Sequence, residues 1–458
     1  MDKQQSRRNI LKMLTASVAT SSVGCSLITE TPQQPKMLST SKQDNWSKTF
    51  DRTWLGGEYW ANPMEDWHIV DGGAECKNSS GSRTVHSLTH QIKYTAKAFK
   101  VSVVVKAIGT HNNVGGFGIR LGVRNEIDEY RSNCFVQKGL DIGIIGNKLS
   151  IDGKTTAMKM SIDDNDIELL LTATPQAGVM ILSLDARLIA SNQSIGQLTH
   201  MISADKVVGN LAVVSNFALR SNAPKTGNNC YRFTHWVMSG DAFEVNLDNK
   251  FGPILWSMYS LNDTRSSEGF VLKLSAITGP LGHEDNQVVE LQVKRCGLWE
   301  SLGTSQLDPD AWVASFRIAN WDEKTQVEYR VIYREKHNDG SETPDVWSGK
   351  IIANPSARPL RMAALTCQND YSFPYAPVVK NVQVLSPDIV FFSGDQIYES
   401  HGGFGIVRAP FESAITNYLR KFYQFGWAFR EIMRDRPTLC LPDDHDVLQG
   451  NLWGEGAL

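Results

Sequence analysis

The sequence predicts three folded parts, in which two β-sandwiches are followed by an α/β segment. Three observations predict this order: apolar and polar residues alternate through much of residues 50–355, Gly-containing turns separate the runs, and strand-like runs alternate with helical ones after residue 360. Period-2 alternation is typical of strands with one buried face, and alternating strands and helices are typical of a parallel sheet. A chain of 458 residues has room for about three domains.

The composition excludes several classes of protein. Hydrophobic residues make up 41% and charged residues 21% of the chain, which is ordinary for a globular protein. Lys and Arg number 46 against 49 for Asp and Glu, so the net charge of −3 leaves no basic excess for a nucleic-acid backbone. No apolar run reaches the ~18 residues that a transmembrane helix needs. The seven Cys form neither a disulfide framework nor a CxxC zinc pattern.

Residues 1–29 are predicted to be an export signal. Residues 6–12 (SRRNILK) precede a mildly apolar stretch, and this pattern resembles a twin-arginine signal. The resemblance implies export by the twin-arginine machinery to a periplasmic or extracellular location. The alternative is a disordered basic N-terminus.

A lipid anchor and a linker are predicted next. Val23-Gly24-Cys25 resembles a lipoprotein cleavage site, which would place a lipid on Cys25, although Ser22 stands where such sites usually carry Leu. Residues 30–48 are polar and rich in Ser, Thr, Gln and Pro, so we interpret them as a linker.

Residues 50–243 are predicted to form the first β-sandwich. Apolar residues alternate over 99–105 and 117–123, and Asp-Gly turns occur at 71–73 and 152–153. Together with residues 67–73 (WHIVDGG), this pattern resembles a concanavalin-like or laminin-G-like jelly roll and implies a polysaccharide partner. The Trp side chains of this region could stack on sugar rings or pack in the core. Core packing is favoured for Trp54, Trp60 and Trp67.

Residues 246–355 are predicted to form a second, smaller β-sandwich. Apolar residues alternate over 289–293 and 327–333, and Asn338-Asp339-Gly340 is a strong hairpin turn because Asp-Gly accepts positive φ. The length and strand spacing suit an immunoglobulin-like or fibronectin-like domain.

Residues 360–458 are predicted to be an α/β segment. Short apolar runs predict strands, and longer periodic runs predict helices; the strands are expected at 362–365, 388–392 and 438–441 and the helices at 376–385 and 410–434. Cys440 lies inside the third strand and is expected in the core.

Polar residues follow each of these three strands at once. They form the segments 366–370 (TCQND), 393–399 (SGDQIYE) and 442–446 (PDDHD). The carboxyl ends of parallel strands lie along one edge of a sheet, so we expect the three segments to converge there. Several carboxylates beside a His would repel one another without a cation, and this donor set suits Fe, Mn, Zn, Mg or Ca.

Residues 394–399 (GDQIYE) and 443–446 (DDHD) resemble the metallophosphatase domain of alkaline phosphatase D, the PhoD-like branch of the calcineurin-like phosphoesterases. The resemblance implies hydrolysis of a phosphomonoester or phosphodiester with Fe and Ca as the favoured metals. It makes Asp395 the bridging ligand, Tyr398 a ferric ligand and Asp444 a ligand of the second metal. His445 becomes the catalytic acid that orients the phosphate.

Further residues are assigned from the resemblance or from their position and charge. Cys367 matches a metal-ligating Cys of some members, and Asn369 is the nearby alternative. Asp443 and His401 are assigned to substrate binding, although exposure to solvent is an equal alternative for His401. Arg408, Arg420 and Arg434 would meet phosphate, but surface positions on helices are favoured for them.

The α/β segment is expected to be an incomplete metallophosphatase domain. Only twelve residues follow Asp446, and the later His ligands of the superfamily have no counterpart in them. We therefore expect an exposed edge of a buried sheet, and weak or no hydrolase activity from this chain.

Two other functions are compatible with the sequence. The first is a non-catalytic extracellular protein whose β-sandwiches bind glycan and whose phosphatase part is inactive. The second is a glycoside hydrolase, which needs two carboxylates across a groove. For that, Glu126 and Asp128 are the nearest pair, but they lie on a predicted turn.

Overall fold

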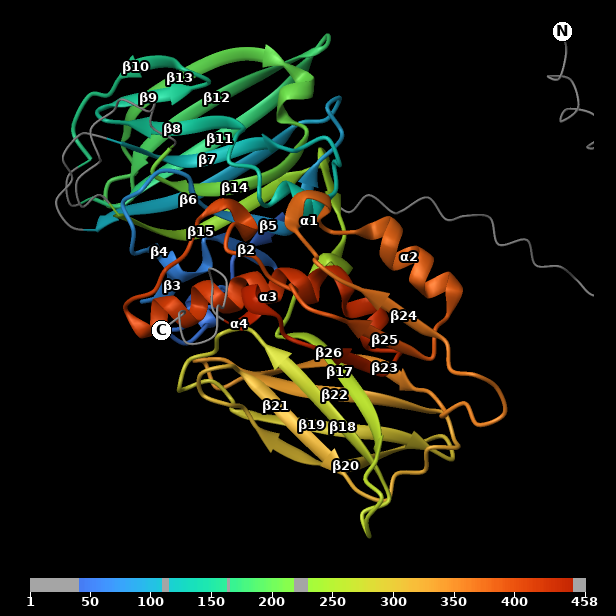
Figure 1. The fold of residues 1–458 in the computed structure, drawn as a ribbon. Helices are drawn as coiled ribbons and strands as arrows, with labels where there is room; N and C mark the ends of the chain where they lie inside the picture. Colours follow the sequence, from blue (N-terminus) through green and yellow to red (C-terminus); the bar gives the residue numbers. More distant parts are fainter. Residues whose placement is uncertain (1–40, 109–114, 163–164, 218–229, 448–458) are drawn as a thin grey trace, which may run out of the picture. The chain divides into compact units, whose positions relative to one another are not determined.

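The computed structural model describes residues 41–108, 115–162, 165–217 and 230–447 (Figure 1). All described residues belong to one compact unit, Ser39–Leu458. The predicted export signal, Cys25 and residues 30–40 of the predicted linker lie outside the described residues. No helix among the described residues is both long enough and apolar enough to cross a bilayer.

The first β-sandwich consists of two eight-stranded antiparallel sheets. The first sheet follows the order β13-β12-β11-β6-β15-β4-β3, with β1 beside β15. Its strands are β1 Ser41–Gln43, β3 Trp67–Val70, β4 Gly73–Cys76, β6 Phe99–Ile108, β11 Ile167–Gln176, β12 Val179–Leu188, β13 Ser194–Ser203 and β15 Cys230–Gly240.

The second sheet follows the order β10-β9-β8-β7-β14-β5-β16, with β2 beside β5. Its strands are β2 Tyr59–Asn62, β5 Arg83–Ile92, β7 Gly116–Val123, β8 Leu140–Ile145, β9 Lys148–Ile151, β10 Lys154–Ala157, β14 Gly209–Ser215 and β16 Phe243–Val245. Between the sheets lies one apolar core, which includes the alternating residues of β6 and β7. The predicted alternation is therefore confirmed.

The predicted linker is wrong at its C-terminal end. Residues 41–43 form β1, which pairs with β15, and Trp46 is fully buried in the core. Lys42 donates to Thr89 at 3.0 Å and pairs with Glu58 at 3.2 Å. This polar segment is ordered because its few apolar and cationic side chains find buried partners, which its composition does not reveal.

The Trp residues of the first sandwich have the core role that the sequence favours. Trp54, Trp60 and Trp67 are 3%, 1% and 0% exposed, so their ring faces cannot receive a sugar from solvent. One short helix, α1 Tyr130–Asn133, was not predicted; Glu129 caps it by accepting from the N–H of Arg131.

The second β-sandwich has seven strands, in sheets ordered β17-β18-β21 and β20-β19-β22-β23. Their bounds are β17 Ile254–Asp263, β18 Phe270–Thr278, β19 Val288–Arg295, β20 Leu298–Gln306, β21 Val313–Ile318, β22 Val327–Lys336 and β23 Glu342–Ile351. The alternating residues of β19 and β22 fill its core, as predicted. Gly340 has φ of 82° in the turn between β22 and β23, which explains the Asp-Gly hairpin signal.

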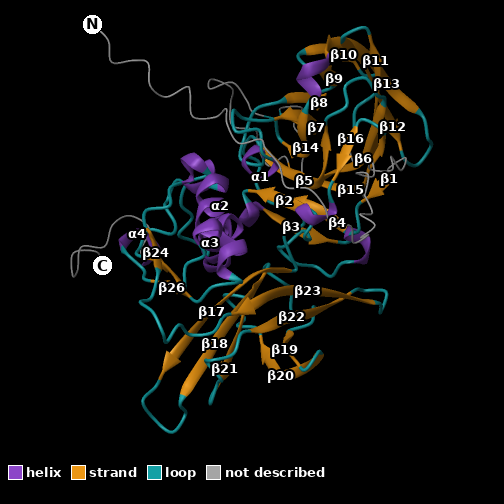
Figure 2. Cartoon of the chain, turned by 90° about the vertical axis from the view of Figure 1, so that its right-hand side faces the viewer, coloured by secondary structure: helices purple, strands orange, loops and turns teal. Residues whose placement is uncertain are grey.

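The C-terminal part contains a parallel sheet in the order β24-β25-β26. Five of its elements agree with the predicted ones to within about two residues: β24 Met362–Leu365, α2 Ala376–Leu385, β25 Ile389–Phe392, α3 Phe411–Met433 and β26 Thr438–Cys440. The short helix α4 Asp444–Val447 was not predicted. Figure 2 shows α2 and α3 as the long helices of the described chain.

Only one face of this parallel sheet is well covered. Val390 and Phe392 point into a core that α2 and α3 share, whereas Met362 and Leu439 of the neighbouring strands are 53% and 45% exposed. Parallel sheets usually bury both faces, so this exposed apolar face is unusual. The sequence analysis expected an exposed edge, whereas these two side chains mark an exposed face among the described residues.

Helix α3 joins the three parts of the described chain. The ring of Trp256 from β17 lies so close to Gly426 that a Cβ on Gly426 would be 2.4 Å from it. On the same helix, Arg420 pairs with Glu65 at 3.0 Å, and both side chains are buried. The predicted surface position of Arg420 is therefore wrong, because Glu65 from the first sandwich neutralises its charge in the interior.

We expect the Arg420–Glu65 pair to be essential for stability. Glu65→Leu should lower the free energy of unfolding by about 3–5 kcal/mol, because a buried guanidinium loses its partner. The double variant Glu65→Leu/Arg420→Met should recover much of the loss. Urea unfolding measures the free energy of unfolding of both variants. Glu268→Gln is the control, because its ion pair with Arg317 is exposed and contributes under about 1 kcal/mol. Equal losses in Glu65→Leu and Glu268→Gln would contradict this role.

We also expect His86 to make the fold acid-sensitive. Complete burial, with a smaller contribution from Arg120, lowers the pKa of His86 to about 3. Between about pH 6.5 and 3 the unfolded chain binds a proton that the folded chain does not, so stability falls with falling pH by up to about 1.4 kcal/mol per unit. In His86→Gln, the free energy of unfolding measured with urea should fall less steeply between pH 7 and 4. Thr84→Val, which removes only the hydrogen bond to the ring, should keep the wild-type pH dependence. An unchanged pH dependence in His86→Gln would refute the assignment.

Candidate metal centre

Backbone hydrogen bonds bring the ends of the three parallel strands together. The N–H of Cys367 donates to the carbonyl of Gly394 at 3.1 Å, and the N–H of Gln368 donates to the carbonyl of Asp395 at 3.0 Å. On the other side, the N–H of Leu441 donates to Phe392 at 2.9 Å. The three polar segments predicted from the sequence therefore do converge.

Gly394 makes the close approach of two of these segments possible. Its φ is 115°, and a Cβ on it would lie 2.6 Å from Cβ of Asp443. Asp395 follows in the left-handed region with φ of 55°, which Asp tolerates better than most residues. The Gly-Asp pair thus turns the Asp395 carboxylate toward the loop that follows β26.

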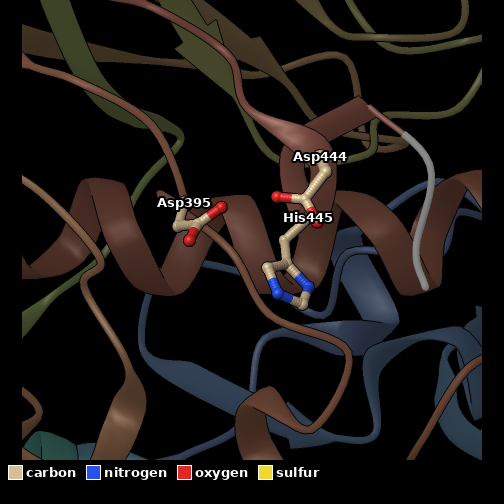
Figure 3. A group of neighbouring side chains, drawn as sticks. All are labelled: Asp395, Asp444 and His445. Carbon is tan, nitrogen blue, oxygen red and sulfur yellow. The ribbon is translucent and has the colours of Figure 1, made fainter. Parts of the chain in front are cut away.

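Three side chains meet at this point (Figure 3). One ligand atom each from Asp395, Asp444 and His445 lie within 4.8 Å of one another. Asp395 comes from the loop after β25, whereas Asp444 and His445 begin α4. Within the described part of the chain, Oδ1 of Asp395 is buried and has no hydrogen-bond partner.

Tyr398 and Cys367 lie beside Asp395. The hydroxyl of Tyr398 donates to Oδ2 of Asp395 at 2.9 Å, and Sγ of Cys367 lies 3.5 Å from the same oxygen. Burial and the hydrogen bonds with Cys367 and Asp395 raise the pKa of Tyr398, so the phenol is neutral in the absence of a cation. Both predicted ligands are therefore within reach of the three-residue cluster.

Glu399 orients His445. Its two carboxylate oxygens lie 2.8 and 3.0 Å from Nδ1 of the imidazole. Burial lowers the pKa of His445, but the hydrogen bond and charge of Glu399, with the charges of Asp395 and Asp444, outweigh it and the net shift is upward. Since Nδ1 is engaged by Glu399, Nε2 is the nitrogen that can serve a cation or a phosphate oxygen.

Asp446 is a site residue that the sequence analysis missed. Its carboxylate accepts from the backbone N–H groups of Asp395, Ile397 and Asp443 at 2.7, 3.0 and 3.0 Å. Asp446 is 7% exposed. Its three hydrogen bonds, which we call the Asp446 clamp, hold the loop after β25 against α4. The segment DDHD contained the signal, but three carboxylates within four residues do not reveal which one points inward.

The other predicted site residues lie around the cluster. Asn369 accepts from the N–H of Tyr371 and begins the turn Asp370–Ser372. Asp443 is exposed at the rim, where its Oδ1 accepts from the N–H of Asp444 at 2.9 Å. His401 is 2% exposed and lies beneath the loop, so the solvent-exposed alternative is wrong. Arg434 pairs with Glu431 at 2.8 Å.

The donor set fits a cation. Two carboxylates, a phenol and an imidazole converge, and the buried unpartnered oxygen of Asp395 lacks the compensation that a buried carboxylate requires. Oxygen donors with one nitrogen suit Fe, Mn, Zn or Ca. Asp395, Asp444 and Tyr398 are therefore the residues that would hold it, and Nε2 of His445 would face the phosphate beside it.

Comparisons with known proteins assign no family. No family model matches the chain, and no curated protein sequence matches it. Arcelin-5, a lectin-like defense protein from Phaseolus vulgaris, has 10% identity and a TM-score of 0.30 over 45% of this chain and 99% of its own. The exoplasmic/lumenal domain of VIP36 bound to Ca2+ and Man3GlcNAc has 10% identity and a TM-score of 0.28 over 43% of this chain and 89% of its own.

A longer but weaker likeness involves an enzyme. The β-glucuronidase of Bacteroides uniformis has 10% identity and a TM-score of 0.21, over 82% of this chain and 42% of its own. All these likenesses are low in both identity and TM-score, so the chain's own residues carry the functional conclusion.

We expect Asp446 to control metal affinity without binding the metal. Asp446→Asn should weaken metal binding about 10–100-fold, because an amide replaces one of the oxygens that fix Asp395. Calorimetric titration with Ca2+ and with Fe2+ measures the effect. Glu431→Gln, which alters a partly exposed carboxylate of α3 away from the site, should bind as tightly as wild type. Normal affinity in a folded Asp446→Asn protein would show that the clamp is dispensable.

Proposed function

We propose that this chain is an exported, metal-dependent phosphoric ester hydrolase of the PhoD-like kind. The observation that carries the proposal is the meeting of Asp395, Asp444 and His445 around a buried carboxylate oxygen that has no partner among the described residues. The Tyr398 hydroxyl at 2.9 Å from Asp395 supports it, because a phenol adds a ligand suited to a ferric ion.

The residues of the proposed site have separate roles. Asp395, Tyr398 and Asp444 would hold the cation, with Cys367 as a further ligand. A bound cation polarises the phosphoryl oxygen and lowers the pKa of a bound water. Asp443, which is exposed beside the cluster, would contact the rest of the ester.

His445 is the proposed acid. Glu399 accepts from Nδ1 and fixes the ring, so that an Nε2–H can donate to the oxygen of the leaving group. The raised pKa of His445, to which Glu399 contributes, favours the protonated ring. Departure of the alcohol as a neutral molecule avoids charge build-up next to Asp395 and Asp444.

Export is part of the proposal. The twin-arginine pattern at residues 6–12 supports transport to the periplasm or beyond, and Cys25 supplies a site for a lipid anchor. The twin-arginine route carries folded proteins, which suits a chain that binds its metal before export.

A second candidate function is binding of a polysaccharide by the first β-sandwich. Its two eight-stranded antiparallel sheets favour this function, since large sheets present broad surfaces. In this alternative the C-terminal part is an inactive remnant. The burial of Trp54, Trp60 and Trp67 removes the aromatic platforms that the sequence offered for stacking on sugar.

Metal content distinguishes the two functions. The full chain, purified after growth with Fe and Ca, should retain metal in stoichiometric amount, and Asp395→Asn should lose it because the central donor becomes neutral. Elemental analysis measures the metal. Turnover of p-nitrophenyl phosphate and bis-p-nitrophenyl phosphate, even if slow, should depend on that metal and disappear in Asp395→Asn.

Asp322→Asn is the matched control, because Asp322 is an exposed carboxylate in the second sandwich. It should keep both metal and turnover. Metal-free wild-type protein that binds polysaccharide in affinity electrophoresis would support the second function. Metal retained with no turnover above the blank would refute hydrolysis by this chain.

A further inference from the structure

An open apolar groove lies next to the candidate metal centre. It has a volume of about 620 Å³ and is lined mainly by the start of α3, the loop before it and the end of α4; Ile406, Phe411, Ala414, Ile415, Tyr418 and Val447 are its main apolar residues. Phe411 and Val447 are 62% and 58% exposed. A volume in this range and an apolar lining are typical of small-molecule sites.

The groove and the metal cluster share helix α4. Val447 lines the groove, and Asp444 belongs to the cluster. These residues are three positions apart in α4, so they lie on the same face of the helix. A molecule whose phosphate contacts Asp444 can therefore extend along α4 into the groove.

Tyr418 provides a second connection. Its ring lines the groove, and its hydroxyl donates to the backbone carbonyl of Asp446. Asp446 in turn holds the N–H of Asp395 at 2.7 Å. The wall of the groove is thus attached to the Asp446 clamp, which also positions Asp395. The distance between the groove and the metal centre is therefore fixed.

The lining selects an apolar ligand. Among the described residues that line the groove, Asp310 and Arg408 are the charged ones, while α3 and α4 contribute Phe411, Ala414 and Val447. A polar leaving group such as a sugar or a nucleoside would lose water here without a matching set of hydrogen bonds. An alkyl or aryl group would gain affinity by about fourfold for each methylene that it buries.

We propose that the substrates are phosphate esters with an extended apolar group, which lies in this groove while the phosphate lies at the metal centre. This inference rests on the proposed hydrolase function and adds the substrate class to it. Continuity along α4 selects this occupant over a second copy of the chain or residues 448–458.

The test compares methylphosphonate with hexylphosphonate as probes of the metal-loaded full chain. Isothermal titration should give a Kd at least tenfold lower for hexylphosphonate. Ala414→Trp should remove this difference by filling the groove, and should leave methylphosphonate binding unchanged. Phe411→Asp is a second variant at an exposed position, expected to do the same if Ala414→Trp fails to fold. Leu298→Asp, at an exposed apolar residue of the second sandwich, is the control and should keep the preference.

The outcomes separate this inference from the proposed function. If both phosphonates bind the wild-type protein equally, the groove has no role, although the hydrolase function stands. If neither phosphonate binds and no metal is retained, the hydrolase function itself fails. A hexyl preference that survives both groove variants places the apolar group elsewhere and overturns the inference.

Two further results would also overturn it. A hexyl preference that emerges only when residues 448–458 are deleted would make that segment the natural occupant. A dimer in sedimentation experiments that dissociates in Phe411→Asp would make a second copy the occupant.

Discussion

The candidate site depends on one carboxylate that binds backbone rather than ligand. Asp446 accepts three N–H groups from two chain segments and so holds the loop after β25 against α4. Without this clamp, Asp395 and Asp444 would separate, because two carboxylates at close range repel each other. The clamp places them together before a cation arrives, which lowers the cost of binding it.

Helix α3 supports this arrangement by packing against the parallel sheet and both sandwiches. Its buried Arg420 is neutralised by Glu65 of the first sandwich, and its Gly426 admits the ring of Trp256 from the second. The same helix packs under Phe392 of the parallel sheet through Phe425 and Phe429. The β-sandwiches therefore serve as supports for the α/β part.

The metal cluster and the apolar groove combine opposite kinds of chemistry within α4. Its first two residues, Asp444 and His445, carry the polar function, and its last residue, Val447, borders the groove. A phosphate ester has this same division between a charged and an uncharged end. The proposed substrate class thus follows from how one short helix distributes its side chains.

The sequence by itself determined the alternating strands β6, β7, β19 and β22, the strands and long helices after residue 360, and the convergence of three polar segments. These features depend on local periodicity and on the rule that parallel strands end at one edge, as the agreement for β24, α2 and β25 illustrates. Only the tertiary structure decided that Asp446 is the clamp, that Glu399 orients His445, that Arg420 is buried and that residues 41–48 join the sandwich. The physical reason is that each of these roles depends on a partner distant in the chain, and neither charge nor composition identifies that partner.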